Sequence, residues 1–172
     1  MKFKPYKLLL AISVPGLLLA LVAAGLIFSS GEKVTTQKLA PDFSLDLLDG
    51  GKFQLSAYKG TPVTINFFAS WCHPCRQEIP SLVAVRSEYK PKGVHFLAIA
   101  IDDTAKDVNA LIAKLGFTFP AGLDTTGKIK DDYGVYGLPT TFFIDKKGMI
   151  SYSHAGSATK ELLRHELDKL LL

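Results

Sequence analysis

Cysteine is scarce in this sequence. The chain has two cysteines among 172 residues, Cys72 and Cys75. One such pair cannot form the set of disulfides that stabilises small secreted domains, and it leaves no third cysteine for a lipoprotein signal. The lack of any other thiol suits a compartment in which stray cysteines would be oxidised.

The sequence also lacks a strong charge of either sign, internal repeats and low-complexity tracts. Its formal net charge is +4 and its isoelectric point is about 9.0, and its lysines and arginines are scattered rather than gathered with aromatic residues. This pattern argues against nucleic acid as a partner. With 48% hydrophobic and 21% charged residues, the chain has room for one domain with a core and for a separate apolar segment.

The N-terminal region holds one long apolar run, residues 8–28, which follows three lysines. As a helix this run would be about 31 Å long, enough to cross the hydrocarbon core of a membrane. Positive charge ahead of a span keeps the N-terminus in the cytoplasm. We therefore expect residues 1–28 to form a cytoplasmic tip and one transmembrane helix in the cell membrane, with everything beyond it periplasmic or otherwise extracytoplasmic. Removal as a secretory signal, with cleavage near Ala24, is the alternative.

The rest of the chain divides into a tether and a domain. Residues 29–39 combine glycine, threonines and mixed charges without apolar periodicity, which indicates a tether. Residues 40–172 alternate apolar, β-branched runs with helical patterns, which predicts one α/β domain. Its clearest part is a βαβ unit of two buried strands, 62–69 and 94–101, joined by a helix over 74–89.

The remaining elements are expected from turn residues and apolar spacing. Along the helix 74–89, the stripe that should face the core contains Ile79, Leu82, Val83 and Arg86. The other expected elements are a hairpin (43–55), a helical turn (55–60), a helix (105–115), a short strand (117–123), a weak helix (126–133), a second hairpin (140–144 and 149–153) and a last helix (159–172).

The cysteine pair falls where the first buried strand ends and the helix begins. Helical spacing brings the Cα atoms of residues i and i+3 to about 5 Å, within the range that a disulfide needs. Cys72 and Cys75 can therefore be bridged or opened without moving the backbone. Cys72, ahead of the helix, should be exposed and should meet unpaired N–H groups that favour its thiolate, whereas Cys75 should turn toward the domain. Cys72 is thus the expected nucleophile.

The residues around the motif resemble a known family. Trp71 and Pro74 flank the cysteines as in the thioredoxin superfamily. The segments 66–70, 75–80 and 40–43 are similar to those of the TlpA/ResA/CcmG group of membrane-anchored extracytoplasmic thiol-disulfide oxidoreductases. The resemblance extends over residues 40–172.

The resemblance implies a fold and an activity. The fold is thioredoxin-like, with a central mixed β-sheet flanked by helices, an N-terminal β-hairpin extension and a helix-containing insertion at about 105–123. The activity is the reduction of disulfides in exported proteins through the Cys72–Cys75 couple, without a further cofactor or metal. Apocytochrome c is the substrate that it most suggests, and a membrane thiol protein would supply electrons.

Glu78 is a candidate for proton transfer. It lies one turn after Cys75, so an inward-pointing carboxylate would approach the thiols, whereas an outward-pointing one would be an ordinary solvated glutamate. Thioredoxins carry a buried acid on the preceding strand, and Asn66 occupies that position here. The resemblance therefore implies that Glu78 carries out the proton transfer during exchange.

Four further residues are candidates for substrate binding. Spacing does not decide whether the Leu138–Pro139 peptide bond is cis or trans, and most X–Pro bonds are trans. The resemblance implies a cis bond in a loop that faces the cysteines and binds the partner's backbone. Trp71 is expected to be a contact surface beside Cys72. His73 is either a group that tunes Cys72 or simply an exposed residue. Outside the site, His95 is expected to be a satisfied core residue.

Three other functions would need residues that this sequence lacks. A zinc site would need a second pair of ligands, which the histidines do not form. A peroxiredoxin-like peroxidase would carry threonine three residues before its reactive cysteine, where this chain has Ala69. A copper or haem chaperone would use Cys72, Cys75 and a histidine, but the two methionines form no cluster.

Overall fold

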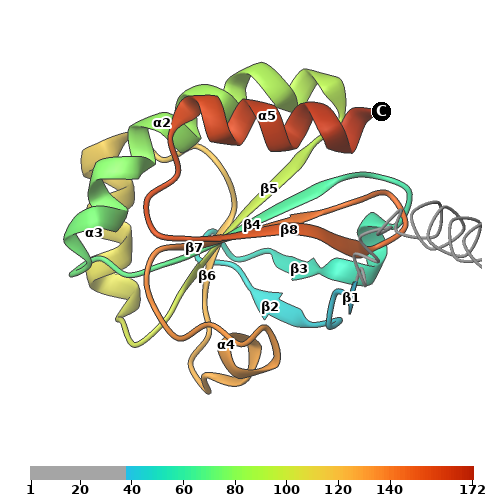
Figure 1. Ribbon diagram of the computed structural model, residues 1–172. Coiled ribbons are helices and arrows are strands. Elements are labelled where there is room, and N and C mark those ends of the chain that lie inside the picture. The colour runs from blue at the N-terminus through green and yellow to red at the C-terminus, as the bar shows by residue number, and fades with distance from the viewer. Residues whose placement is uncertain (1–37) are drawn as a thin grey trace, which may run out of the picture. The chain divides into compact units, whose positions relative to one another are not determined.

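The computed structural model describes residues 38–172 (Figure 1). The predicted anchor and the predicted tether up to residue 37 lie outside these residues, so the membrane topology stays a prediction. Within residues 38–172, no helix combines the length and the apolar character needed to cross a membrane.

A six-stranded mixed sheet forms the centre of the domain, in the order β1-β8-β7-β4-β5-β6. Strands β4, β5 and β6 are parallel. Strand β7 pairs antiparallel with β4, β8 with β7, and β1 with β8. The bounds are Lys38–Leu39 (β1), Val63–Phe68 (β4), His95–Ala100 (β5), Ala121–Leu123 (β6), Thr140–Ile144 (β7) and Met149–Ala155 (β8). The expected central mixed sheet is confirmed.

Strand β4 leads directly to the cysteine motif. Every residue of β4 is buried, because β5 and β7 pair with its two edges and packed layers cover both faces. Side chains alternate between the faces of a strand. Ile65 and Phe67 therefore enter one core, whereas Asn66 and Phe68 point into the core on the side of the first long helix.

Helices cover both faces of the sheet (Figure 1). Three helices bury apolar residues against one face, namely α2 (His73–Tyr89), α3 (Ala105–Leu115) and α5 (Lys160–Leu171). The opposite face carries α4 (Lys128–Asp132) and the two-stranded hairpin of β2 (Ser44–Asp46) and β3 (Lys52–Gln54). Short 3₁₀ turns follow β3 and α2, at Leu55–Tyr58 (η1) and Lys90–Lys92 (η2).

The hairpin packs closely on the edge strand β6. Leu47 forms an isolated antiparallel bridge with Gly122, and the Leu48 N–H donates to the Ala121 carbonyl over 2.8 Å. A Cβ atom at position 122 would lie 2.6 Å from the carbonyl oxygen of Asp46, so only glycine allows this approach. The expected hairpin extension is confirmed, and it is attached to the inserted strand.

The buried stripe of α2 differs from the expected one. Val83 and Arg86 are only half-buried, and the stripe instead continues through Val85 and Tyr89. Val83 packs against the core from the margin of this stripe, as expected. The prediction for Arg86 is wrong because Cys75, which is fully buried, sets the register of the stripe, and Val85 and Tyr89 follow from it at helical spacing.

One end of the predicted tether belongs to the sheet. Lys38 and Leu39 pair with Ile150 and Met149 at the edge of β8, and the Ala40 N–H donates to the Gly148 carbonyl in the turn that precedes β8. Backbone groups make these contacts, so no apolar periodicity accompanies them in the sequence.

Candidate active site

The cysteine motif lies where β4 ends and α2 begins. Cys72 is the N-cap residue of α2, and Cys75 lies in its first turn. Their Cα atoms are 5.3 Å apart and a disulfide joins their sulfurs, as helical spacing predicts. Pro74 also lies in the first turn, where the missing N–H of proline has no helical partner to lose. The motif is therefore present in its oxidised form.

Cys72 and Cys75 differ in their surroundings. The Cys75 N–H donates to Cys72 Sγ over 3.2 Å, a contact that stabilises a thiolate at the start of a helix. Cys72 is 5% exposed and Cys75 is 0% exposed. Cys72 is thus less exposed than expected, because the walls of a hollow surround it, but it remains the more accessible of the two.

The hollow at Cys72 has a volume of about 360 Å³. Its walls include Trp71, His73 and Leu138, so the structure brings these predicted contact residues together around the accessible sulfur. The Leu138–Pro139 peptide bond is cis, as the resemblance implies and as spacing alone left open.

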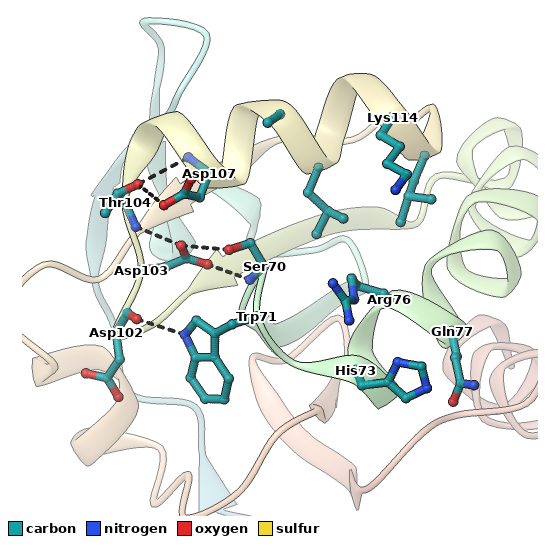
Figure 2. Close-up of a pocket in the computed structure, with 13 residues that line it drawn as sticks. Ser70, Trp71, His73, Arg76, Gln77, Asp102, Asp103, Thr104, Asp107 and Lys114 are labelled. Carbon is teal, nitrogen blue, oxygen red and sulfur yellow. Dashed lines mark hydrogen bonds between the residues drawn. The ribbon is translucent and has the colours of Figure 1, made fainter.

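The junction between β5 and α3 holds the stretch that precedes Cys72 (Figure 2). The Asp103 carboxylate accepts hydrogen bonds from both the N–H and the hydroxyl of Ser70. The exposed ring of Trp71 donates from Nε1 to the Asp102 carbonyl over 3.0 Å. Asp102 has a φ of 51°, which non-glycine residues seldom adopt. Sequence analysis missed both aspartates because only the fold brings them to the motif.

A larger groove of about 920 Å³ lies on the other side of Trp71 (Figure 2). Its lining includes His73, Arg76 and Gln77 at the start of α2, and it includes five residues of α3, namely Asp107, Ala110, Leu111, Lys114 and Leu115. Trp71, His73 and Asp102 border both hollows, so they separate the groove from the hollow that contains Cys72.

Glu78 points inward from α2 and is 3% exposed. Its Oε1 accepts from Nδ2 of Asn66 and its Oε2 accepts from the N–H of Ala158, each over 2.8 Å. Burial raises the pKa of Glu78 to about 7, while these two hydrogen bonds oppose the rise. The alternative of a solvated surface glutamate is wrong.

Asn66 connects Glu78 to the strand that follows the cis-proline. Its Nδ2 also donates to Thr141 Oγ1 over 3.0 Å, and its Oδ1 has no partner among residues 38–172. The loop after β8 makes a second connection, since Ser157 donates to the Pro74 carbonyl in the neighbouring motif. Neither connection has a sequence signature.

His95 lies away from the site and is exposed, so its expected place in the core is wrong. It is the first residue of β5, and its ring packs edge-on against Tyr58 with centroids 4.6 Å apart. Partial burial there lowers the pKa of His95. In the part of the chain that the structure describes, no three His, Cys, Asp or Glu side chains form a group that could hold a metal ion.

Thiol-disulfide exchange needs a dithiol that opens and closes without backbone movement, with one sulfur accessible to a partner and the other held back. The Cys72–Cys75 pair meets these requirements on a thioredoxin-like fold. Fold and site therefore define a thiol-disulfide oxidoreductase of the thioredoxin superfamily.

Known proteins agree with this assignment. A family model described as AhpC/TSA family matches residues 36–153. The chain is 38% identical over 143 residues to the thiol-disulfide oxidoreductase ResA of Bacillus cereus, with 83% of each chain covered. It is 40% identical over 134 residues to the thioredoxin-like protein YneN of Bacillus subtilis, which covers 75% of this chain and 76% of YneN.

A solved structure of a thiol:disulfide interchange protein from Chlorobium tepidum superposes with a TM-score of 0.73 at 30% identity, over 79% of this chain and 97% of the other. The chain belongs to the AhpC/TSA family and, within it, to the ResA-like thiol-disulfide oxidoreductases.

Proposed function

We propose that this protein is a membrane-anchored reductase of disulfides in exported proteins, with apocytochrome c as its candidate substrate. One observation carries the proposal: Cys72 opens onto the hollow beside the cis Leu138–Pro139 bond, while Cys75 and Glu78 lie buried behind it. A partner chain reaches only one of the two sulfurs, which gives exchange a fixed order.

The reaction starts from the reduced protein. The Cys72 thiolate attacks one sulfur of the substrate disulfide, that bond breaks, and the departing substrate thiolate takes a proton from water. Glu78 accepts the proton of Cys75, whose thiolate then attacks the Cys72 sulfur of the mixed disulfide. The second substrate cysteine leaves as a thiolate and takes up a proton from water, and Glu78 releases its proton to solvent. Two electrons have passed to the substrate, and a dithiol protein of the membrane reduces Cys72–Cys75 again.

The side chains around the hollow orient the substrate. Trp71 offers an exposed aromatic face beside Cys72. Leu138 also lines the hollow, and the partner's backbone binds along the cis Leu138–Pro139 segment. His73 lies exposed next to Cys72, where its protonated form would favour the thiolate. Residues 8–28 anchor the protein in the cell membrane and place this site on the extracytoplasmic side.

The reduction potential of the Cys72–Cys75 couple decides whether the protein reduces disulfides in its substrates or forms them. The full-length protein in detergent is equilibrated with glutathione buffers, and its dithiol fraction is measured by thiol trapping. We expect a potential near that of thioredoxin, about −270 mV. A value near the oxidising end of the superfamily, about −120 mV, would overturn the reductase assignment.

The substrate is tested separately. The reduced protein is mixed with apocytochrome c that carries an internal disulfide, and with an unrelated oxidised exported protein as the control. We expect the apocytochrome to be reduced faster. Equal rates would remove apocytochrome c from the proposal without affecting the reductase assignment.

A further inference from the structure

The groove beyond Trp71 contains acidic and basic side chains that differ in their pairing. All three aspartates of the groove have partners: Asp102 forms an ion pair with Lys130 at 3.7 Å, Asp103 accepts from Ser70 and Thr104, and Asp107 accepts from the Thr104 hydroxyl over 2.7 Å. These contacts hold the start of α3, and they keep the three negative charges at the opposite end of the groove from Lys114 (Figure 2).

Two basic side chains and one amide side chain of the groove are unpaired. Among residues 38–172, no hydrogen bond or ion pair engages the side chain of Arg76, Gln77 or Lys114, and all three are exposed. Figure 2 shows Arg76 and Lys114 at the same end of the groove, one on α2 and the other on the last turn of α3. Free hydrogen-bond donors with positive charge therefore dominate this end.

The groove also has an apolar floor and lies close to the reacting sulfur. Ala110, Leu111 and Leu115 line it between the polar side chains. Arg76 lies one helical turn after Cys72, or about 6 Å along the helix axis, and an extended chain advances about 3.3 Å per residue. A chain whose cysteine reacts at Cys72 thus reaches Arg76 about two to four residues away.

We propose that this groove binds an extended acidic segment of the substrate, with a carboxylate about two to four residues from the reacting cysteine placed between Arg76 and Lys114. A guanidinium binds a carboxylate in a bidentate manner, and apolar side chains of the segment cover the floor. The inference rests on the proposed function, because it names the class of exported protein that the site prefers. The groove thereby adds selection by charge to the contacts that the substrate makes in the hollow at Cys72.

Binding is measured without exchange, so that the outcome does not depend on the reductase activity. Ten-residue peptides with serine at the cysteine position, and with aspartates, asparagines or lysines two to four residues away, are titrated into the oxidised full-length protein in detergent. Trp71 is the only tryptophan of the chain and borders the groove, so its fluorescence reports binding. We expect the acidic peptide to bind about 10-fold more tightly than the basic one at low salt, and about equally at 1 M salt.

Variants separate the groove from the general charge of the protein. The double substitution R76Q/K114Q should abolish the preference for the acidic peptide. R76Q and K114Q alone should each weaken the preference. Lys106→Gln, which like each of them removes one positive charge, lies at an exposed position of α3 outside the groove and should keep the preference.

Three outcomes would overturn the proposal. They are equal binding of the three peptides by the wild type, an equal loss of preference in K106Q, and self-association in sedimentation experiments that R76Q/K114Q abolishes, which would assign the groove to a second copy of this chain. A protein that prefers the acidic peptide but reduces no disulfide would contradict the proposed function alone.

Discussion

Glu78 is a buried acid whose proton affinity differs between the folded and unfolded states. Burial raises its pKa from an ordinary value of 4.5 to about 7. The folded protein therefore binds more protons than the unfolded chain between these two values, and the free energy of unfolding falls as pH rises through the window and is level above it. We expect the wild type to lose about 3 kcal/mol relative to Glu78→Gln between pH 4.5 and pH 7.

Denaturant unfolding of the two oxidised proteins at a series of pH values measures this difference. The glutamine of Glu78→Gln does not titrate, so this variant shows the contribution of all the other titrating groups and serves as the control. Parallel stability curves would show that the carboxyl group of Glu78 titrates in the same way in both states.

The Ala158 N–H is one of two donors that favour the ionised form of Glu78. Ala158→Pro removes this donor, so the pKa of Glu78 should rise further, and the pH profile of the resolving step should move up by about one unit. Ala158→Gly keeps the N–H and is the matched control. The rate at which a mixed disulfide resolves, followed from pH 5 to pH 9, tests the prediction; coincident profiles for the two variants would disprove it.

The sequence could predict the burial of Glu78 but not its partners. Glu78 lies three residues after Cys75 and four before Leu82, both of which are fully buried, so helical spacing places it on the same stripe. Asn66 comes from another strand, and Ala158 is 80 residues away and contributes only its backbone N–H. Because every residue except proline carries that group, no residue type marks such a partner.

Helix α2 divides the work of exchange between its N-cap and its first turn. Cys72 caps the helix at the hollow, whereas Cys75 is fully buried, where desolvation raises the pKa of a thiol. Cys75→Ser should therefore attack a substrate disulfide and stall as a mixed disulfide, while Cys72→Ser should form no adduct. Non-reducing electrophoresis after reaction with an oxidised peptide compares the two variants. An adduct that accumulates with Cys72→Ser but not with Cys75→Ser would reverse the roles.

The bounds of the long apolar elements were predictable to within one residue at each end, and those of weaker elements were not. Helix α3 and strand β7 have the expected bounds, 105–115 and 140–144. Helix α4 is shorter than the expected 126–133, because its N-cap Gly127 has a φ of 72°, which lies outside the helical region. The Asp124 carboxylate accepts from the Lys130 N–H and so satisfies one of the free donors of the first turn.

The arrangement of the whole sheet depends on more than local patterns. A βαβ unit predicts that β4 and β5 are parallel neighbours, but nothing in either hairpin dictates that β7 pairs with the other edge of β4. The resemblance to the thioredoxin superfamily implied a mixed sheet, and the structure shows the order of its strands. The same pairing places the cis Leu138–Pro139 bond, which immediately precedes β7, at the end of the sheet where Cys72 lies. The topology of the sheet thus completes a site that the motif alone only begins.

The position of the domain relative to the membrane is the last prediction, and it concerns the chain as a whole. Three lysines precede the apolar run 8–28, so the N-terminus should stay in the cytoplasm and the domain should lie outside. Protease added to intact spheroplasts should then digest the domain, while a cytoplasmic marker survives. Replacing the three lysines with glutamine should leave a fraction of the chains protected, because the signal that sets orientation is weakened. Complete protection of the unaltered protein would mean that the domain faces the cytoplasm, where its disulfide would be kept reduced.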